Sequence, residues 1–204
     1  MIYEMRTYMV KMGSVRAAEA AFERALPGRI KLSPLAAFWH SEIGQLNQII
    51  HVWPYESQAH REQIRAAAGK VEGWPPALQE FLVEQKTEIF MPAPFSPPLV
   101  PAQLGSLVEM RRYTIRPGGI PTLIKNWSER IEKRAKLSPF IAGWYSEVGP
   151  LNQWLHIWAY QDYAERERIR AEAMKDGSWP PPMGDLLVKA ENSILIPASF
   201  SPIR

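Results

Sequence analysis

Cysteine is absent from the 204-residue sequence. Its absence excludes disulfide bonds, thiolate metal ligands, iron–sulfur clusters and cysteine nucleophiles. Histidine is scarce as well, with four copies and neither an HExxH motif nor a zinc-binding spacing. The sequence also lacks the GxGxxG, GxSxG and P-loop motifs, which mark dinucleotide sites, hydrolase nucleophiles and phosphate-binding loops. We therefore expect no metal and no cofactor.

Long apolar runs and clusters of like charge are missing too. Lys and Arg number 24 against 21 Asp and Glu, a net charge of +3 without a basic run, so we expect no nucleic-acid partner. No window approaches the roughly 18 apolar residues of a membrane span, and Glu4 and Arg6 interrupt the N-terminal segment. We expect a cytoplasmic protein without a membrane span. Its 46% hydrophobic residues suffice for a sizeable core.

The chain contains an internal duplication. Residues 3–97 align with residues 108–202 without a gap, at a constant offset of 105 positions, and about 40 of about 95 pairs are identical. The longest shared block is SEIGQLNQIIHVWPY against SEVGPLNQWLHIWAY. Between the copies, residues 91–105 are rich in proline, which favours an extended, semi-rigid connection.

Each copy shows the same alternation of strand-like and helix-like segments. Short runs of β-branched, aromatic and charged residues that stop near a glycine predict strands over 2–10 and 107–115. Apolar residues at helical spacing follow, and in the second copy they form one stripe from Ile120 to Ile131, which predicts a continuous helix. The rest of the first copy predicts strands over 35–43 and 47–55, a helix over 57–70 and a last strand over 84–92, which recurs at 189–197.

The order βαββαβ in each copy is the split-βαβ arrangement of ferredoxin-like units. One such unit leaves one face of its sheet uncovered, and two copies in one chain can cover each other. We predict an α+β fold in which two tandem ferredoxin-like βαββαβ units form a pseudo-twofold dimeric α+β barrel. The units span 1–97 and 106–204, with a Pro-rich linker at 98–105. Further assembly of this intramolecular pseudo-dimer into a homo-oligomer is left open.

The predicted strands over 35–43 and 47–55 form a hairpin through Gly44. The second of these strands carries most of the candidate ligand-binding residues. Alternation places His51, Trp53 and Tyr55 on one face and Ile50 and Val52 on the other. We expect the aliphatic face to pack on the helices, so that the aromatic face lies against the opposite sheet or lines a cleft for an organic ligand. The alternative is an aromatic core around hydrogen-bonded histidines. The candidate binding residues are Arg6, Tyr8, Asn47, His51, Trp53, Tyr55, Arg111, Tyr113, Asn152, His156, Trp158 and Tyr160.

Charged residues recur at matching positions of both copies. The first strand places three polar side chains on one face, namely Glu4, Arg6 and Tyr8, and again Glu109, Arg111 and Tyr113. The arginine suits a substrate carboxylate, and the alternative is an ion pair with the glutamate. Arginine pairs one helical turn apart suit an anion or a solvated helix face, and these are Arg61 with Arg65 and Arg166 with Arg170. Asn47 and Asn152, near the predicted hairpin turns, bind either a ligand or the backbone.

The block NQxxHxWxY after a glycine-containing turn, with ExRxY in the first strand and an arginine-bearing charged helix, resembles the NIPSNAP family. The resemblance covers both copies and is most specific at Asn47, Gln48, His51, Trp53 and Tyr55, and at Asn152, Gln153, His156, Trp158 and Tyr160. It implies the dimeric α+β barrel fold, whose members include cofactor-free monooxygenases and haem-handling enzymes. It implies no established reaction.

Three functions follow as hypotheses. The first is binding of a small organic molecule in a cleft between sheet and helix. The second is a cofactor-independent enzyme, monooxygenase-like or isomerase-like, in which His51 or His156 transfers a proton, and the third is a protein-interaction scaffold. The copies should differ, because Trp154 replaces Ile49 and an extra indole fills volume. We expect at most one site of high affinity, with the His51 cleft the roomier.

Overall fold

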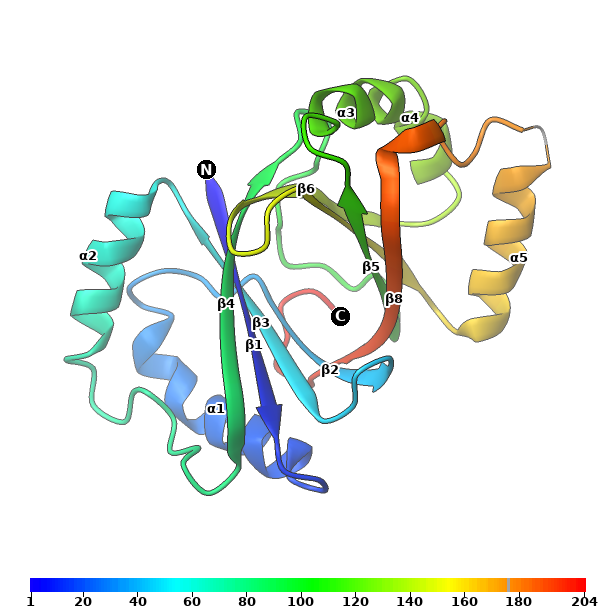
Figure 1. Cartoon of the computed structure of the whole chain (residues 1–204). Helices are drawn as coiled ribbons and strands as arrows, with labels where there is room; N and C mark the ends of the chain where they lie inside the picture. Colours follow the sequence, from blue (N-terminus) through cyan, green and yellow to red (C-terminus); the bar gives the residue numbers. More distant parts are fainter. Residues whose placement is uncertain (176) are drawn as a thin grey trace.

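The computed structural model describes residues 1–175 and 177–204. The first unit (Figure 1) has the order β1 (Ile2–Val10), α1 (Val15–Arg29), β2 (Ala37–Ile43), β3 (Gln48–Tyr55), α2 (Gln58–Ala68) and β4 (Leu82–Pro92). Helix α1 forms where small and apolar residues recur every three or four positions, and Ala18, Phe22 and Leu26 of this stripe are buried. The predicted strands of this unit agree with the structure to within about two residues at their starts.

The second unit repeats this order with one difference in its helices. Its elements are β5 (Leu107–Ile115), α3 (Ile120–Ser128), α4 (Ile131–Ala135), β6 (Phe140–Val148), β7 (Gln153–Tyr160), α5 (Tyr163–Met174), the 3-10 turn η1 (Gly184–Leu186) and β8 (Leu187–Pro197). The prediction of one continuous helix from Ile120 to Ile131 is wrong. The Ser128 hydroxyl donates to the Lys125 carbonyl at 2.7 Å, and the Arg130 amide donates three residues back to Trp127 at 3.0 Å. These bonds interrupt the regular α-helical pattern, in which each amide donates to the carbonyl four residues earlier, and the helix breaks here.

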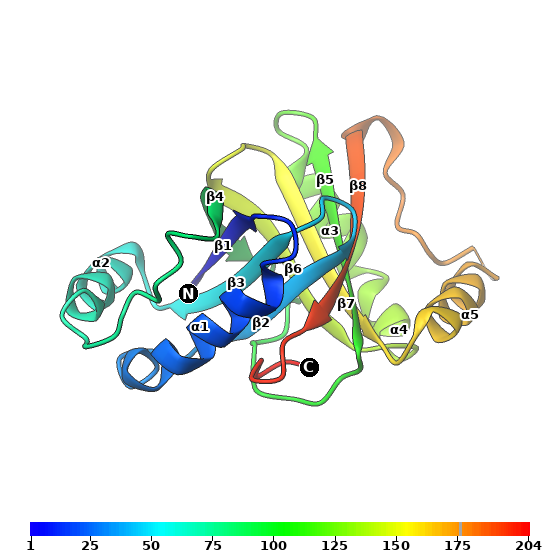
Figure 2. The same cartoon turned by 90° about the horizontal axis from the view of Figure 1, so that it is seen from below.

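The strands form one closed antiparallel barrel in the order β1-β3-β2-β8-β5-β7-β6-β4. The two units join along two seams, where β2 pairs with β8 and β4 pairs with β6. In Figure 2 the helices α1 and α2 flank the barrel on one side, and α4 and α5 flank it on the other. This closure pairs the edge strands of each unit with those of the other. The predicted fold, two ferredoxin-like units in a dimeric α+β barrel, is therefore confirmed.

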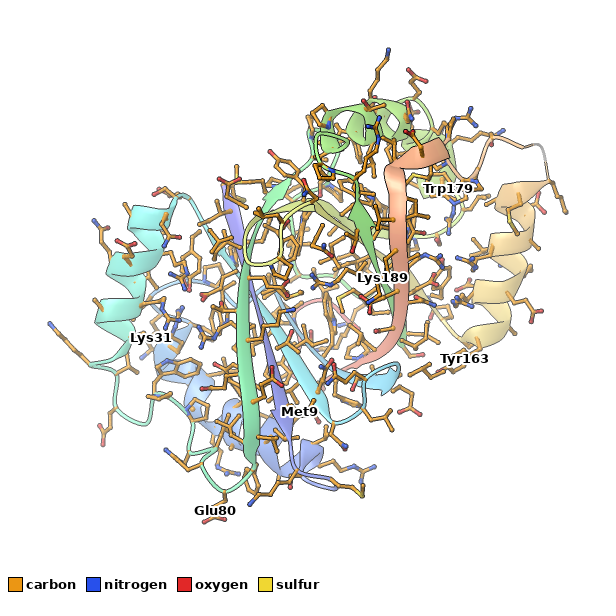
Figure 3. All side chains as sticks on the ribbon, in the orientation of Figure 1. Met9, Lys31, Glu80, Tyr163, Trp179 and Lys189 are labelled. Atoms are coloured by element: carbon orange, nitrogen blue, oxygen red, sulfur yellow. The ribbon has the colours of Figure 1, made fainter. Side chains whose placement is uncertain are left out.

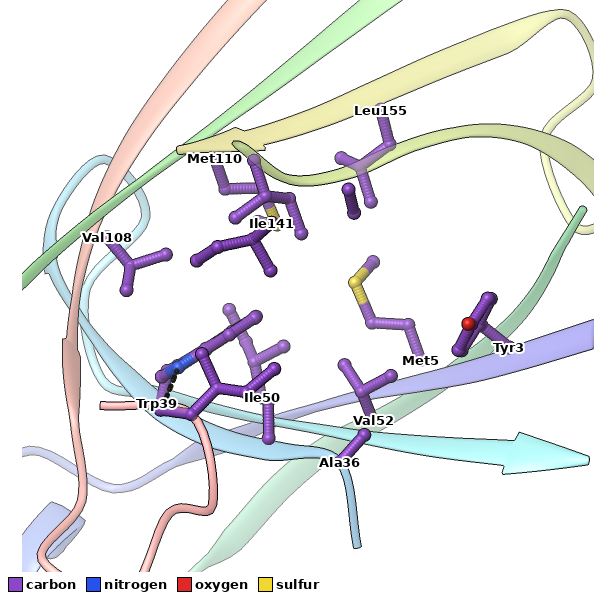
Figure 4. Close-up of a cluster of buried hydrophobic side chains, with 14 of the residues drawn as sticks. Tyr3, Met5, Ala36, Trp39, Ile50, Val52, Val108, Met110, Ile141 and Leu155 are labelled. Carbon is purple, nitrogen blue, oxygen red and sulfur yellow. Dashed lines mark hydrogen bonds between the residues drawn. The ribbon is translucent and has the colours of Figure 1, made fainter. Parts of the chain in front are cut away.

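Apolar side chains of both units fill the inside of the barrel. Ile50 and Val52 of β3 lie in one buried cluster with Leu155 of β7 (Figure 4). In the same cluster, the rings of Tyr3 and Trp144 stack across the units with their centroids 4.4 Å apart. The expectation that Ile50 and Val52 pack against the helices is thus wrong. Six of the eight residues of β3 are buried on one face or the other, so alternation alone does not identify the face that meets the partner sheet.

The opposite face of β3 carries the aromatic residues and packs against the helices. Ile49, Trp53 and Tyr55 share a second buried cluster with Phe22 and Leu26 of α1. The residues between β4 and β5 contribute Leu99 and Leu104 to the surroundings of the interior cluster. Within the described residues, no helix is both long and apolar enough to cross a membrane.

Residues 1–97 expressed alone should not persist as a soluble monomer. The fragment would expose the apolar interior face of its sheet and leave the edges of β2 and β4 unpaired. Sedimentation velocity should therefore show dimers or larger assemblies. A stable, soluble monomer of this fragment would contradict the account in which the two units depend on each other.

Candidate functional site

A cavity of about 490 Å³ lies between the sheet and the helices of the first unit. Its floor is the outer face of the sheet, and its walls come from both helices and from the segment that follows α2, where the Trp74–Pro75 peptide bond is cis. Trp179, labelled in Figure 3, occupies the matching segment of the second unit, between α5 and β8. Aromatic and charged side chains line the first cavity together, namely Glu4, Arg6, Tyr8, Phe22, Arg29, His51, Trp53, Tyr55, Arg65 and Trp74.

His51 is held in one tautomer by its neighbour on the same strand face. The indole nitrogen of Trp53 donates to His51 Nδ1 at 2.7 Å. An indole N–H only donates, so Nδ1 is the acceptor and the neutral ring carries its proton on Nε2. Burial, reinforced by the charge of Arg6, lowers the pKa of His51 to about 3. The Nε2 atom is buried and has no hydrogen-bond partner among the described residues.

Glu4 is a buried carboxylate inside a cluster of arginines. Its Oε1 atom accepts from Arg61 at 2.6 Å, from Thr87 at 2.9 Å and from Arg6 at 3.0 Å. Burial alone would raise the pKa of Glu4, but the hydrogen bond from Arg61 and the charges of Arg6 and Arg61 hold it at about 2. The second oxygen, Oε2, is buried and has no partner among the described residues. Glu4 is therefore an ionised group with one free acceptor.

Arg29 also lines the first cavity, although it is not among the candidate residues predicted from the sequence. Its guanidinium stacks on the Trp53 ring at 4.1 Å from the centroid and donates to the Tyr55 hydroxyl at 3.0 Å and the Ser33 hydroxyl at 2.9 Å. A signal was present in the sequence, because Arg29 continues the apolar α1 stripe of Phe22 and recurs as Arg134 in the other copy.

The second unit contains the same network around a smaller cavity of about 170 Å³. Trp158 donates to His156 Nδ1 at 2.8 Å, and burial lowers the pKa of His156 well below its ordinary value. Arg166 donates to Glu109 Oε1 at 2.6 Å. The Oε2 atom of Glu109 also has a partner, because the Tyr160 hydroxyl donates to it at 3.3 Å. The second unit thus keeps the polar framework, but its cavity is smaller and both oxygens of Glu109 have partners.

The size difference has a cause other than the expected one. The first cavity is the larger, as the sequence analysis expects, but Trp154 does not line the second cavity. It packs against Trp127, with 5.1 Å between the ring centroids. Among the lining positions that differ, two carry a clearly larger side chain in the second unit, because Trp127 replaces Phe22 and Met174 replaces Gly69. The larger side chains reduce the free volume of the second cavity.

The candidate residues divide into two groups. Ten line the cavities, five in each unit, namely Arg6, Tyr8, His51, Trp53 and Tyr55, and Arg111, Tyr113, His156, Trp158 and Tyr160. Asn47 and Asn152 lie in the hairpin turns with φ of 57° and 55° and line neither cavity. Asparagine tolerates this left-handed backbone better than most residues, which gives both a structural role.

Metal binding finds no support in the described part of the chain, where no cluster of three or more histidine, aspartate or glutamate side chains occurs. The two buried histidines lie on separate strands of separate units, and each uses Nδ1 for a tryptophan.

Comparison with known proteins identifies the family. The sequence profile of the NIPSNAP family matches residues 3–97 and again residues 108–202. The chain belongs to the NIPSNAP family. Human Protein NipSnap homolog 3B is 28% identical over 217 residues, which cover 99% of this chain and 85% of that relative. Mouse Protein NipSnap homolog 2 is 26% identical over 214 residues, which cover 100% of this chain and 76% of that relative.

The NIPSNAP units also share their combined architecture with proteins of low sequence identity. A crystal structure of a candidate monooxygenase from Lactobacillus acidophilus matches with a TM-score of 0.62, over 96% of this chain and 92% of that chain. The two sequences are 11% identical, so this likeness concerns the fold alone.

The buried histidines should make this NIPSNAP protein less stable as the pH falls below about 6.5. Unfolding returns each histidine to an ordinary pKa of 6.5, so between pH 6.5 and about 3 the unfolded chain binds the additional proton at His51. The free energy of unfolding should fall by up to about 1.4 kcal/mol per pH unit for each buried histidine. The lowered pKa of Glu4 adds to this loss only below its ordinary value of 4.5.

Urea unfolding at several pH values between 8 and 5 measures this effect. The wild type should lose stability below pH 6.5, and His51→Phe should show a shallower decline. His60→Gln, at the start of α2 and outside both cavities, is the matched control and should retain the wild-type slope. A wild-type stability that stays flat from pH 8 to pH 5 would show that these histidines ionise normally in the folded protein.

Proposed function

We propose that this protein binds a small organic molecule in the cavity of its first unit and that the second unit has lost this capacity. The observation that carries the proposal is a cavity of about 490 Å³ whose lining includes two buried, unpartnered polar atoms, Glu4 Oε2 and the Nε2 of His51. The second unit repeats the unpartnered imidazole nitrogen at His156, but its cavity is smaller and Glu109 Oε2 has a partner. A buried donor without a partner costs about 1–3 kcal/mol. A ligand oxygen that accepts from the Nε2–H would recover part of this free energy.

The lining of the cavity suits a flat, largely apolar molecule. Phe22, Trp53 and Trp74 contribute aromatic surface, and Pro75 and Pro76 close one side. Aromatic rings bind flat ligands through large contact areas with little loss of side-chain entropy. The volume of about 490 Å³ lies in the range of small-molecule sites.

Proton transfer by His51 has less support than ligand binding. Its Nδ1 lone pair already accepts a hydrogen bond from the Trp53 indole N–H. The burial that lowers the pKa of His51 to about 3 also makes the imidazole a weak base. The same holds for His156, which accepts from Trp158. In our proposal the imidazole is a fixed hydrogen-bond donor that recognises the ligand.

Exchanging one lining residue between the units tests the proposal. Gly69 has φ of −62°, and a Cβ there would lie 3.6 Å from its nearest neighbour, so the position accepts a side chain. Gly69→Met places in the first cavity the side chain that occupies the second. We expect it to weaken binding of the neutral fluorescent probe N-phenyl-1-naphthylamine about tenfold or more, the effect of losing about 1.4 kcal/mol.

Gly69→Ala is the matched control, because it makes the same backbone change without filling the cavity. Its probe affinity should remain within about threefold of the wild type, since a single methyl removes little volume. Circular dichroism and thermal unfolding confirm that all variants fold. Unchanged probe affinity in Gly69→Met would place the probe elsewhere and contradict the proposal.

A further inference from the structure

We propose that the first cavity selects an organic anion, a carboxylate carried on a flat unsaturated body, and that Arg65 is the residue that pairs with it. This inference rests on the proposed function, because it names the class of ligand for the same cavity. It adds a charge requirement that binding of an apolar molecule does not have.

The described lining of the first cavity carries more positive than negative charge. Three guanidinium groups, those of Arg6, Arg29 and Arg65, line the cavity, and Glu4 is the one carboxylate among its described lining residues. Arg61 also reaches this carboxylate, from outside the lining. One negative charge therefore faces an excess of positive charge in a partly enclosed, aromatic space. Such a field concentrates anions and discriminates against cations.

The three arginines of the lining differ in how many of their donors other groups already occupy. Arg6 is committed to Glu4 and to the Tyr8 hydroxyl, at 3.0 and 2.8 Å. Arg29 is held by hydroxyl groups and by stacking on Trp53. In the part of the chain that the structure describes, the Arg65 side chain has a single polar contact, an ion pair at 3.5 Å with Glu4 Oε1, and it is 45% exposed. Arg65 therefore has spare donors where solvent and ligand can reach it.

The position of Arg65 also suits a contact with a ligand carboxylate. Arg65 stands on α2, one helical turn beyond Arg61, and faces the sheet across the cavity. A guanidinium offers two parallel N–H groups, which match the two oxygens of a carboxylate. The flat body of the ligand then extends over Trp53 on the floor of the cavity and against Phe22 on the α1 wall. In this arrangement the half-exposed Arg65 binds the carboxylate of the ligand, and the aromatic side chains inside the cavity contact its apolar body.

The second unit supplies a matched control residue. Arg170 occupies the position of Arg65, with an ion pair at 3.7 Å to Glu109 Oε1 and a side chain that is 36% exposed. Its cavity is about 170 Å³, too confined for a ligand that fills the first. An arginine in this position without adequate cavity space should therefore contribute nothing to binding.

Calorimetric titration with two probes of nearly equal shape tests the inference. The probes are 2-naphthoate, which is an anion at neutral pH, and 2-naphthamide, which is neutral. The wild type should bind the acid about tenfold more tightly than the amide, and Arg65→Met should remove most of that difference. Arg170→Met should leave both affinities unchanged, and Arg65→Lys should keep part of the preference because the charge remains.

The outcomes separate this inference from the proposed function. Equal affinities of the wild type for acid and amide, or equal losses for both probes in Arg65→Met, would overturn the anion requirement while the cavity still binds a ligand. Failure of both probes to bind would overturn the anion requirement and the proposed function together. Increased salt should weaken binding of the acid more than binding of the amide, and an equal effect on both would also contradict the inference.

Discussion

The pairing of edge strands between the two units is the constraint on which the rest of the molecule depends. Each unit has two free edges, and β2–β8 and β4–β6 pair them all, so the sheets close around a single apolar interior. Closure uses one face of every strand for the interior. The polar residues of β1 and β3 are therefore left on the outer face, where the helices cover them and where a cavity forms.

The polar network on that outer face is shared by both units, whereas the features that suit ligand binding belong to the first unit. Both units keep the tryptophan-to-histidine bond and the arginine stacked 4.1 Å from a tryptophan ring. Because both copies have this network, it serves to position the sheet and helices whether or not a ligand binds. The larger cavity and the unpartnered Glu4 Oε2 distinguish the first unit, because the Nε2 atoms of His51 and His156 are both buried without a partner among the described residues. A duplicated fold thus allows one copy to be filled for stability while the other keeps its cavity.

The sequence was sufficient to predict the duplication, the order of elements and the barrel, because the repeat is gapless and each strand has a clear pattern. It did not predict which face of β3 meets the partner sheet. Ile50 and His51 are both buried, and the difference between their environments arises only when the second unit closes the barrel. The helix break at Ser128 was missed because the apolar stripe to Ile131 continues through it.

The candidate site could be predicted in part from the alternation of residues along the strands. Alternation places Arg6 and Tyr8 on one face of β1 and His51 and Trp53 on one face of β3, and all four line one cavity. Arg29 was missed because a lone arginine near a helix end is usually solvated, and its stacking on Trp53 is a tertiary contact. The roomier cavity was predicted correctly, but for a replacement, Trp154, that lies outside the second cavity.

The most direct test of a single open binding site is crystallographic. Crystals of this protein soaked with 6-bromo-2-naphthoate and measured at the bromine absorption edge locate the probe without assumptions about its pose. The account predicts one anomalous bromine peak per chain, between the sheet and α2 of the first unit and beside the His51 and Trp53 side chains. Peaks of equal height in both cavities, or a peak elsewhere with none beside His51, would contradict it.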